Sequence, residues 1–138
     1  MSFGIEAREV EGITVLQVSG RLIAGHDIAT LRAMFDDLIA SNKNRIVLNL
    51  KQLDYMDSSG LGVLVTGYTS VSRAGGAIKL SNISKRSAQL LILTKLSTVF
   101  EIFEDDQSAV NSFFPERAIK HFDILEFVKR QPRDSAAE

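Results

Sequence analysis

The hydrophobic pattern of the chain changes its period several times, and this alternation constrains the fold more than any other feature. Residues 13–20 form a run rich in β-forming residues, which is typical of a strand. Together with residues 3–10 and the turn signal Glu11-Gly12, this run predicts a β-hairpin at the start of the chain.

A helix is predicted after the hairpin, where the period becomes helical. Apolar side chains recur on one helical face at Ile28, Leu31, Met34 or Phe35, and Leu38. Either His26 or Asp27 is placed to start this helix, and Asn42 helps to end it. The run Arg45–Leu50 then has the length and continuous apolarity of a central strand that is buried on both faces.

The segment Leu53–Gly76 is predicted to contain a second helix in its latter half. Four apolar side chains of this half fall on one stripe: Leu61, Leu64, Val65 and Tyr68. The pair Gly75-Gly76 ends the helix, and Ala77–Leu80 follows as another strand.

Strand and helix continue to alternate toward residue 114. Ser84 caps a predicted helix that runs through Leu93. Val99–Phe103 has the character of a last short strand, and a helix follows from about Asp105 to Phe114. This order predicts an α/β fold, in which helices pack on a mixed β-sheet that opens with a β-hairpin.

The C-terminal segment differs from the rest. Pro115 suits the first turn of a new helix, which we predict within Glu116–Arg130. Its apolar residues recur every third position, at Ile119, Phe122, Leu125 and Val128. This extra C-terminal helix either packs on the domain or joins a partner, for example a second copy in a homodimer. We expect a domain at residues 1–114, then a helical extension whose polar tail, Gln131–Glu138, is disordered.

The composition excludes several function classes. The chain has 138 residues, which suits one domain, and no cysteine, which excludes disulfides, thiolate zinc sites, iron–sulfur clusters and thiol catalysis. Its net charge of −1 argues against direct binding of nucleic acid. We see no secretory signal and no apolar run of the roughly 18 residues that a membrane span needs. We therefore expect a cytoplasmic protein without membrane insertion.

The stretch Asp57–Gly62, with the sequence DSSGLG, lies directly before the second predicted helix. Asp57 or either serine is able to cap the backbone N–H groups of the first helical turn, and that helix end tolerates an anion. Gly60 and Gly62 leave the turn without side-chain bulk, so another molecule is able to approach the backbone. The plainest interpretation is a well-capped helix with two convenient glycines.

Catalytic interpretations of this stretch find little support. The glycines lack the spacing of a dinucleotide fingerprint, no P-loop Gly-Lys-Ser/Thr follows, and Asp57 replaces the first glycine of a hydrolase elbow around Ser59. His26 and His121 are isolated in the sequence, which makes a poor case for a general base or a metal site. We therefore expect no enzyme activity, no cofactor and no metal.

The sequence resembles the STAS family, the domains of sulfate transporters and anti-sigma factor antagonists, and more narrowly the bacterial antagonists. The likeness rests on YMDSSGLGVL preceded by RIVLNLKQLD, on the opening MSFGIEAR, and on Gly20, Gly75-Gly76 and Asn82–Ser84. It covers roughly residues 2–113, so it implies a STAS-like fold for the domain at 1–114 and nothing about the extension.

The resemblance implies a partner switch. Such an antagonist, when unphosphorylated, binds an anti-sigma factor that is also a serine kinase, and so releases the sigma factor. Phosphorylation by that kinase frees the antagonist, and a PP2C-type phosphatase resets it. By position Ser58 is the phosphoacceptor, and Asp57 flanks and orients it. The contact surface around it consists of Ser59, Gly60, Leu61 and Gly62.

Arg21 stands in a loop where many antagonists carry acidic residues. Because that loop lies near DSSGLG in the family fold, we count Arg21 with the partner-binding residues. Either a solvated arginine or one that contacts a phosphate or a carboxylate fits the position. Two other functions remain: a stand-alone STAS subunit of an ABC-type lipid transport assembly, and a scaffold in a stress-sensing complex. Such scaffolds usually carry an N-terminal sensor domain, which favours the antagonist.

Overall fold

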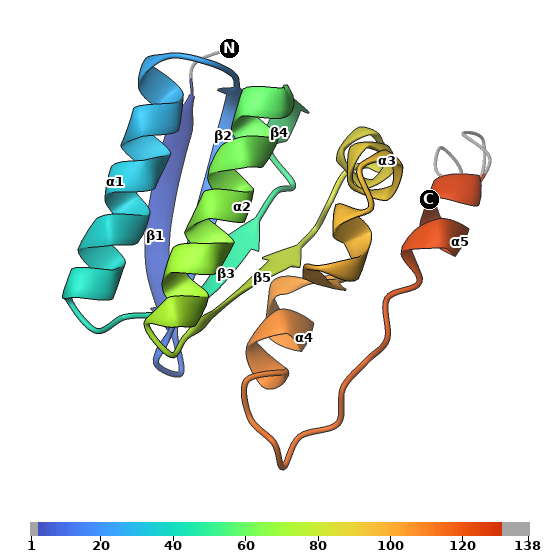
Figure 1. Cartoon of the computed structure of the whole chain (residues 1–138). Coiled ribbons are helices and arrows are strands. Elements are labelled where there is room, and N and C mark those ends of the chain that lie inside the picture. Colours follow the sequence, from blue (N-terminus) through green and yellow to red (C-terminus); the bar gives the residue numbers. More distant parts are fainter. Residues whose placement is uncertain (1–2, 131–138) are drawn as a thin grey trace.

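The computed structural model describes residues 3–130 and has a six-stranded sheet with helices packed on it (Figure 1). The strands are β1 (Gly4–Val10), β2 (Ile13–Leu22), β3 (Arg45–Asn49), β4 (Leu53–Met56), β5 (Ala77–Ser81) and β6 (Glu101–Phe103). The helices are α1 (His26–Ala40), α2 (Ser58–Arg73), α3 (Lys85–Leu93), α4 (Asp106–Asn111) and α5 (Ile124–Lys129), with a short 3-10 helix at Leu96–Thr98. This order confirms the predicted α/β fold.

The sheet is mixed, as predicted. Its strands lie in the order β1-β2-β3-β5-β6, and β4 pairs with the far end of β2. Among the strand pairs of residues 3–130, the β1–β2 hairpin is antiparallel and the other pairs are parallel. The hairpin turns at Glu11 and Gly12, whose φ angles of 53° and 83° match the turn that suits the right-handed twist of a hairpin.

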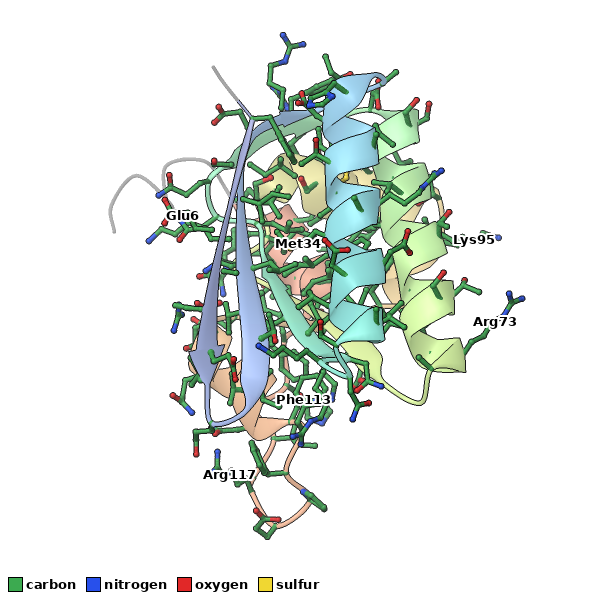
Figure 2. All side chains as sticks on the ribbon, turned by 90° about the vertical axis from the view of Figure 1, so that its left-hand side faces the viewer. Glu6, Met34, Arg73, Lys95, Phe113 and Arg117 are labelled. Carbon is green, nitrogen blue, oxygen red and sulfur yellow. The ribbon has the colours of Figure 1, made fainter. Side chains whose placement is uncertain are left out.

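Two apolar clusters hold the layers together. The larger lies between the sheet and the pair α1 and α2, which Figure 2 shows on one side of the hairpin. The smaller lies where α4 packs on the opposite face, with Val47 and Phe103 among its members. Because β3 contributes to both clusters, it is the buried central strand that the sequence predicts.

The ends of most helices agree with their sequence signals. α1 begins at His26, and Asn42 follows its end with a φ of 61°. Ser84 caps α3 by accepting a hydrogen bond from the Ser87 N–H at 3.1 Å. The Asp105 carboxylate caps α4 in the same way, accepting from the Ser108 N–H at 2.8 Å.

Three elements differ from the prediction. The sequence pattern does not indicate β4 as a separate strand, because only its first and last residues are buried. β6 begins at Glu101 rather than Val99, since the chain before it is still leaving the 3-10 helix. α4 ends at Asn111 rather than Phe114, because its last turn gives way to a turn at residues 112–117.

The predicted extra C-terminal helix is present as α5, but its predicted start near Pro115 is wrong. Residues 115–117 form a turn, residues 118–123 have no regular structure, and α5 covers only Ile124–Lys129. Arg117 explains part of this course, because it donates to both carboxylate oxygens of Glu11 at 2.6 and 3.0 Å. That ion pair places Arg117 beside the hairpin turn.

We call residues 115–130 the C-terminal strap. Phe122 and Val128 pack against the larger core cluster, whereas Ile119 and Leu125 are exposed. The apolar repeat of three therefore does not form one buried stripe, since a three-residue step drifts around a helix. A homodimer contact through this segment stays a prediction, and the tail that we expect to be disordered lies outside the described residues.

None of the helices within residues 3–130 is both long enough and apolar enough to cross a membrane.

Candidate functional site

Asp57 joins three parts of the fold at the start of α2. Its carboxylate accepts a hydrogen bond from the Gly60 N–H at 2.9 Å, which caps α2. Its second oxygen accepts from the Ala24 N–H at 3.3 Å, in the loop between β2 and α1. Its own N–H donates to the Leu22 carbonyl at 3.2 Å. Asp57 therefore connects the first turn of α2 to the loop between β2 and α1 through hydrogen bonds.

These hydrogen bonds also stabilise the ionised form of Asp57. The Gly60 N–H lowers the pKa of the carboxyl most, and the N–H groups of Ala24 and Ser59 lower it further. The burial of the group acts in the opposite direction and does not prevail. Asp57 is therefore a fixed anion next to the two serines, and both of its oxygens are already occupied by backbone donors.

Ser58 and Ser59 are both exposed, but they border different grooves. The Ser58 groove, of about 450 Å³, lies between the β4–α2 junction and α3. Its lining residues are Tyr55, Met56, Asp57, Ser58, Arg86, Ser87, Gln89, Leu90 and Leu93. Two apolar side chains in it are unusually accessible, since Leu93 is 81% and Tyr55 37% exposed. A hydroxyl thus lies beside an apolar surface that water now covers.

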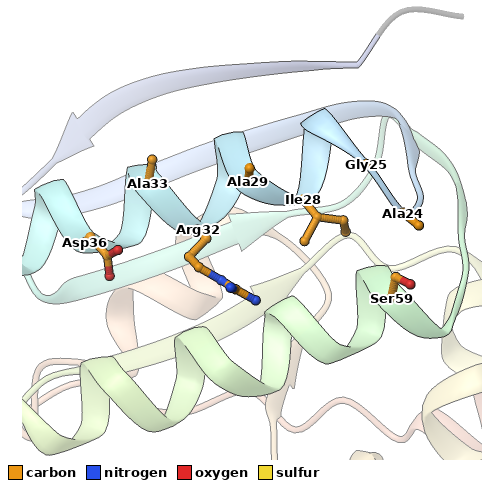
Figure 3. Close-up of a pocket in the computed structure, with 8 residues that line it drawn as sticks. All are labelled: Ala24, Gly25, Ile28, Ala29, Arg32, Ala33, Asp36 and Ser59. Carbon is orange, nitrogen blue, oxygen red and sulfur yellow. The ribbon is translucent and has the colours of Figure 1, made fainter.

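The Ser59 groove, of about 390 Å³, lies on the opposite side of the same helical turn, against α1. Its lining residues are Ala24, Gly25, Ile28, Ala29, Arg32, Ala33, Asp36 and Ser59. Figure 3 shows the Arg32 side chain extending from α1 toward α2, with Ser59 near one end of the groove. Most of these side chains are small, and the one large apolar side chain among them, Ile28, is half-buried.

The two glycines of the turn have different roles. A Cβ on Gly60 would overlap the Leu22 carbonyl and press on the Met56 side chain, so Gly60 is required by internal packing. Gly62 is exposed, and a Cβ there would meet nothing within 4 Å. Leu61 is buried, with 7% of its surface exposed. Of the predicted contact residues after Ser58, only Ser59 and Gly62 therefore present themselves to a partner.

Arg21 lies close to the site, as the resemblance implies. It pairs with Tyr55 across β2 and β4, and its guanidinium lies 5.4 Å from the centre of the Tyr55 ring. Among residues 3–130 no carboxylate forms an ion pair with Arg21. Arg21 therefore lies against the Tyr55 ring, which itself lines the Ser58 groove.

The two histidines are not brought together. His26 is the exposed first residue of α1, and His121 lies in the C-terminal strap, where it lines a separate cavity. Within the part of the chain that the structure describes, no group of three or more His, Asp or Glu side chains is arranged to hold a metal ion.

The α3 wall of the Ser58 groove is absent from our sequence-based site. One signal for it exists, since residues 90–93 read Leu-Leu-Ile-Leu. A helix cannot turn four consecutive apolar residues toward one core, so at least one must face outward. In the structure Leu91 is buried and Leu93 is exposed. Which side chains Leu93 faces depends on long-range packing, which the local pattern does not contain.

Comparisons with known proteins find one family model, described as the STAS domain, that matches residues 4–109. The chain is 30% identical over 111 residues to the anti-sigma F factor antagonist of Paenibacillus polymyxa, covering 80% of this chain and 94% of that protein. It is 27% identical over 112 residues to the anti-sigma-B factor antagonist of Bacillus subtilis, covering 80% and 99%.

Solved structures show the same fold. An anti-sigma factor antagonist from Mycobacterium paratuberculosis superposes with a TM-score of 0.70 at 20% identity, covering 80% of this chain and 93% of that chain. The phosphorylated form of the Bacillus cell fate determinant SpoIIAA superposes with a TM-score of 0.63 at 21% identity, covering 81% and 99%. All of these matches leave about a fifth of the present chain uncovered, and the family match ends before the C-terminal strap.

Proposed function

The chain belongs to the STAS domain family, and from this we propose that it is an anti-sigma factor antagonist. In this proposal the unphosphorylated chain binds an anti-sigma factor that is also a serine kinase, which releases the sigma factor. A PP2C-type phosphatase reverses the later phosphorylation, and the cycle takes place in the cytoplasm. The two curated relatives support the proposal, because both are named antagonists and the chain covers nearly their full length.

The proposed phosphoacceptor is Ser58. It is exposed at the first residue of α2, beside a groove that is open to a partner. Asp57 orients the turn through backbone donors, so its carboxylate is not needed to hold the serine hydroxyl. This position of an exposed serine next to an accessible apolar surface is the observation that carries the proposal.

The proposed partner surface combines the Ser58 groove with its rim. Leu93 and Tyr55 supply exposed apolar area, and the Arg21 guanidinium lies over the Tyr55 ring. Ser59 and Gly62 extend the surface along the first turns of α2. Exposed aromatic and aliphatic anchors around a small polar centre are typical of the energetic centres of protein interfaces.

A phosphate on Ser58 would act by local masking. It adds a charge of about −1.5 to −2 and three acceptor oxygens where the partner packs on a neutral hydroxyl. Breaking a desolvated polar contact costs on the order of 2–5 kcal/mol. At about 1.4 kcal/mol per tenfold change, this weakens binding roughly 30- to several-thousand-fold. The fold itself need not change.

In this role the chain is the substrate of a kinase rather than a catalyst. We propose residues 1–114 as the domain that carries the switch and residues 115–138 as an extension. No feature of residues 3–130 favours the transport-subunit alternative over the antagonist, and the experiment below separates the two.

The test is an ATP-dependent pulldown from the native cell extract with the parent chain, Ser58→Ala and the matched control Ser59→Ala. The parent and Ser59→Ala should capture an anti-sigma factor and release it when ATP is added. Ser58→Ala should capture it equally and retain it with ATP. Loss of capture by Ser58→Ala would indicate a structural serine, and capture of an ABC-type ATPase instead would overturn the proposal.

A further inference from the structure

We propose that Arg86 on α3 is the residue that binds the phosphate group once Ser58 carries it, as an intramolecular phosphoserine–arginine pair across the groove. The inference rests on the proposed function, because it takes Ser58 as the modified residue. It goes further in assigning a receptor for the phosphate within this chain.

The first observation is that Arg86 and Ser58 line the same groove from opposite walls. Arg86 is exposed, and a long flexible stem lets an arginine head reach across a groove of this size. Ser59, although adjacent in sequence, borders the groove against α1 and does not share a wall with Arg86. The pairing is therefore specific to one of the two serines.

The second observation concerns the charges around the groove. Asp57 and Arg86 are the only ionisable acid and base that line it, apart from the Tyr55 phenol, within residues 3–130. Asp57 is occupied by the N–H groups of Gly60 and Ala24, and no ion pair of the described residues involves Arg86. Arg86 therefore faces the groove without a carboxylate that a phosphate would have to displace.

The third observation is that α3 is held firmly from its other side. The Lys85 ammonium group donates to the Arg130 carbonyl of the C-terminal strap at 2.7 Å. Phe127 packs against the core beside it and contacts the ring of Phe122, with centroids 5.3 Å apart. The Lys85 side chain thus binds the strap and not the groove. The next residue, Arg86, lines the groove from a helix that these contacts hold in place.

The chemistry of the pair follows from these positions. A guanidinium binds a phosphate through two parallel N–H···O hydrogen bonds, which are stronger than neutral ones. The pair offsets the repulsion between the new phosphate and Asp57. Because the paired groups span the groove, they also cover the apolar surface of Leu90 and Leu93. Phosphorylation would then close the partner surface from within the chain as well as charge it.

The test uses the full chain with phosphoserine built in at position 58 during synthesis, so no kinase is needed. A ³¹P NMR titration measures the second pKa of the phosphate in the otherwise unchanged chain, in Arg86→Gln and in Arg86→Lys. A nearby cation stabilises the dianion, so Arg86→Gln should raise this pKa by on the order of half a unit, less than a buried pair would. Arg86→Lys should lie between the two.

A control variant makes the result specific. Arg32→Gln removes the cation of the Ser59 groove. This variant should titrate like the phosphorylated parent. An unchanged pKa in Arg86→Gln, or an equal rise in Arg32→Gln, would overturn the proposal. A failure of the kinase to modify Ser58 would instead contradict the proposed function and leave this titration intact.

Discussion

The two grooves that flank the first turn of α2 differ sharply although adjacent residues border them. The Ser58 groove runs along α3 and exposes two large apolar side chains, Tyr55 and Leu93. The Ser59 groove runs along α1 and is lined mainly by small side chains. A phosphate would therefore have different consequences at the two serines. The effect of a phosphate on either serine therefore depends on the helix that lines the groove beside it, α3 for Ser58 and α1 for Ser59.

The sharpest test of this difference places a phosphate at either serine. Phosphoserine at position 58 should weaken binding of the anti-sigma factor by about 30- to several-thousand-fold, because it introduces charge into the apolar contact. Phosphoserine at position 59 should weaken it less than about tenfold, since Ile28, the large apolar side chain of its groove, is half-buried. Isothermal titration calorimetry measures the affinity of both phosphorylated chains for the anti-sigma factor. An equal loss of affinity in the two would contradict the distinction between the grooves.

The glycines of the same turn separate folding from binding. Gly60→Ala should lower the free energy of unfolding by about 1–3 kcal/mol, because its Cβ would overlap the Leu22 carbonyl. Gly62→Ala should leave stability unchanged or raise it by up to about 1 kcal/mol, since alanine favours the helix. Urea denaturation of the two variants checks this. A Gly60→Ala protein as stable as the parent would show that the turn is less tightly packed than described.

Two exposed leucines test whether the α3 side is the binding side. Leu93→Ser, in the Ser58 groove, should weaken partner binding by about 1–2 kcal/mol, as the loss of an apolar anchor does. Leu125→Ser, on α5, should leave affinity unchanged, because that side chain is exposed outside the groove. Surface plasmon resonance compares the two. An affinity that is lost only with Leu125→Ser would move the interface to the C-terminal strap.

The smallest effect expected concerns the charge of Asp57. Its pKa lies below the ordinary value of 3.8, because backbone N–H groups bind the carboxylate. The resulting stabilisation is present above the ordinary pKa and is lost as the pH falls through the lowered one. Asp57→Asn keeps a capping oxygen, but its unfolding temperature should fall less than that of the parent as the pH is lowered. Thermal unfolding of both proteins between about pH 2 and 5 measures this difference. If the unfolding temperatures of the two proteins fell in parallel with pH, the assigned hydrogen bonds would be contradicted.

Much of the fold could be predicted from local patterns. The hairpin, β3, α2 and α3 follow from hydrophobic period, glycine turns and caps such as Ser84. β4 could not be predicted from the sequence, because only its first and last residues, Leu53 and Met56, are buried and the strand shows no alternating pattern. The course of the strap could not be predicted, because a repeat of three resembles a helical pattern and contacts such as the Arg117–Glu11 ion pair join residues far apart in the sequence.

The candidate site shows the same limit. The turn, its cap at Asp57 and the two serines could be located in the sequence, because they are contiguous. The separation of Ser58 from Ser59 and the contribution of Arg86 could not, because α3 reaches the groove only through tertiary packing. The internal role of Gly60 likewise depends on Leu22 of β2, which precedes it by one helix and two strands.

The central claim is that Ser58, and not its neighbour, is the switch. The most direct measurement incubates the chain with the anti-sigma factor kinase that it captures and with ATP, and maps the phosphate by tandem mass spectrometry. We predict a single phosphate on Ser58, and none on Ser58→Ala under the same conditions. A phosphate on Ser59 in the parent chain, or undiminished phosphorylation of Ser58→Ala, would contradict the account.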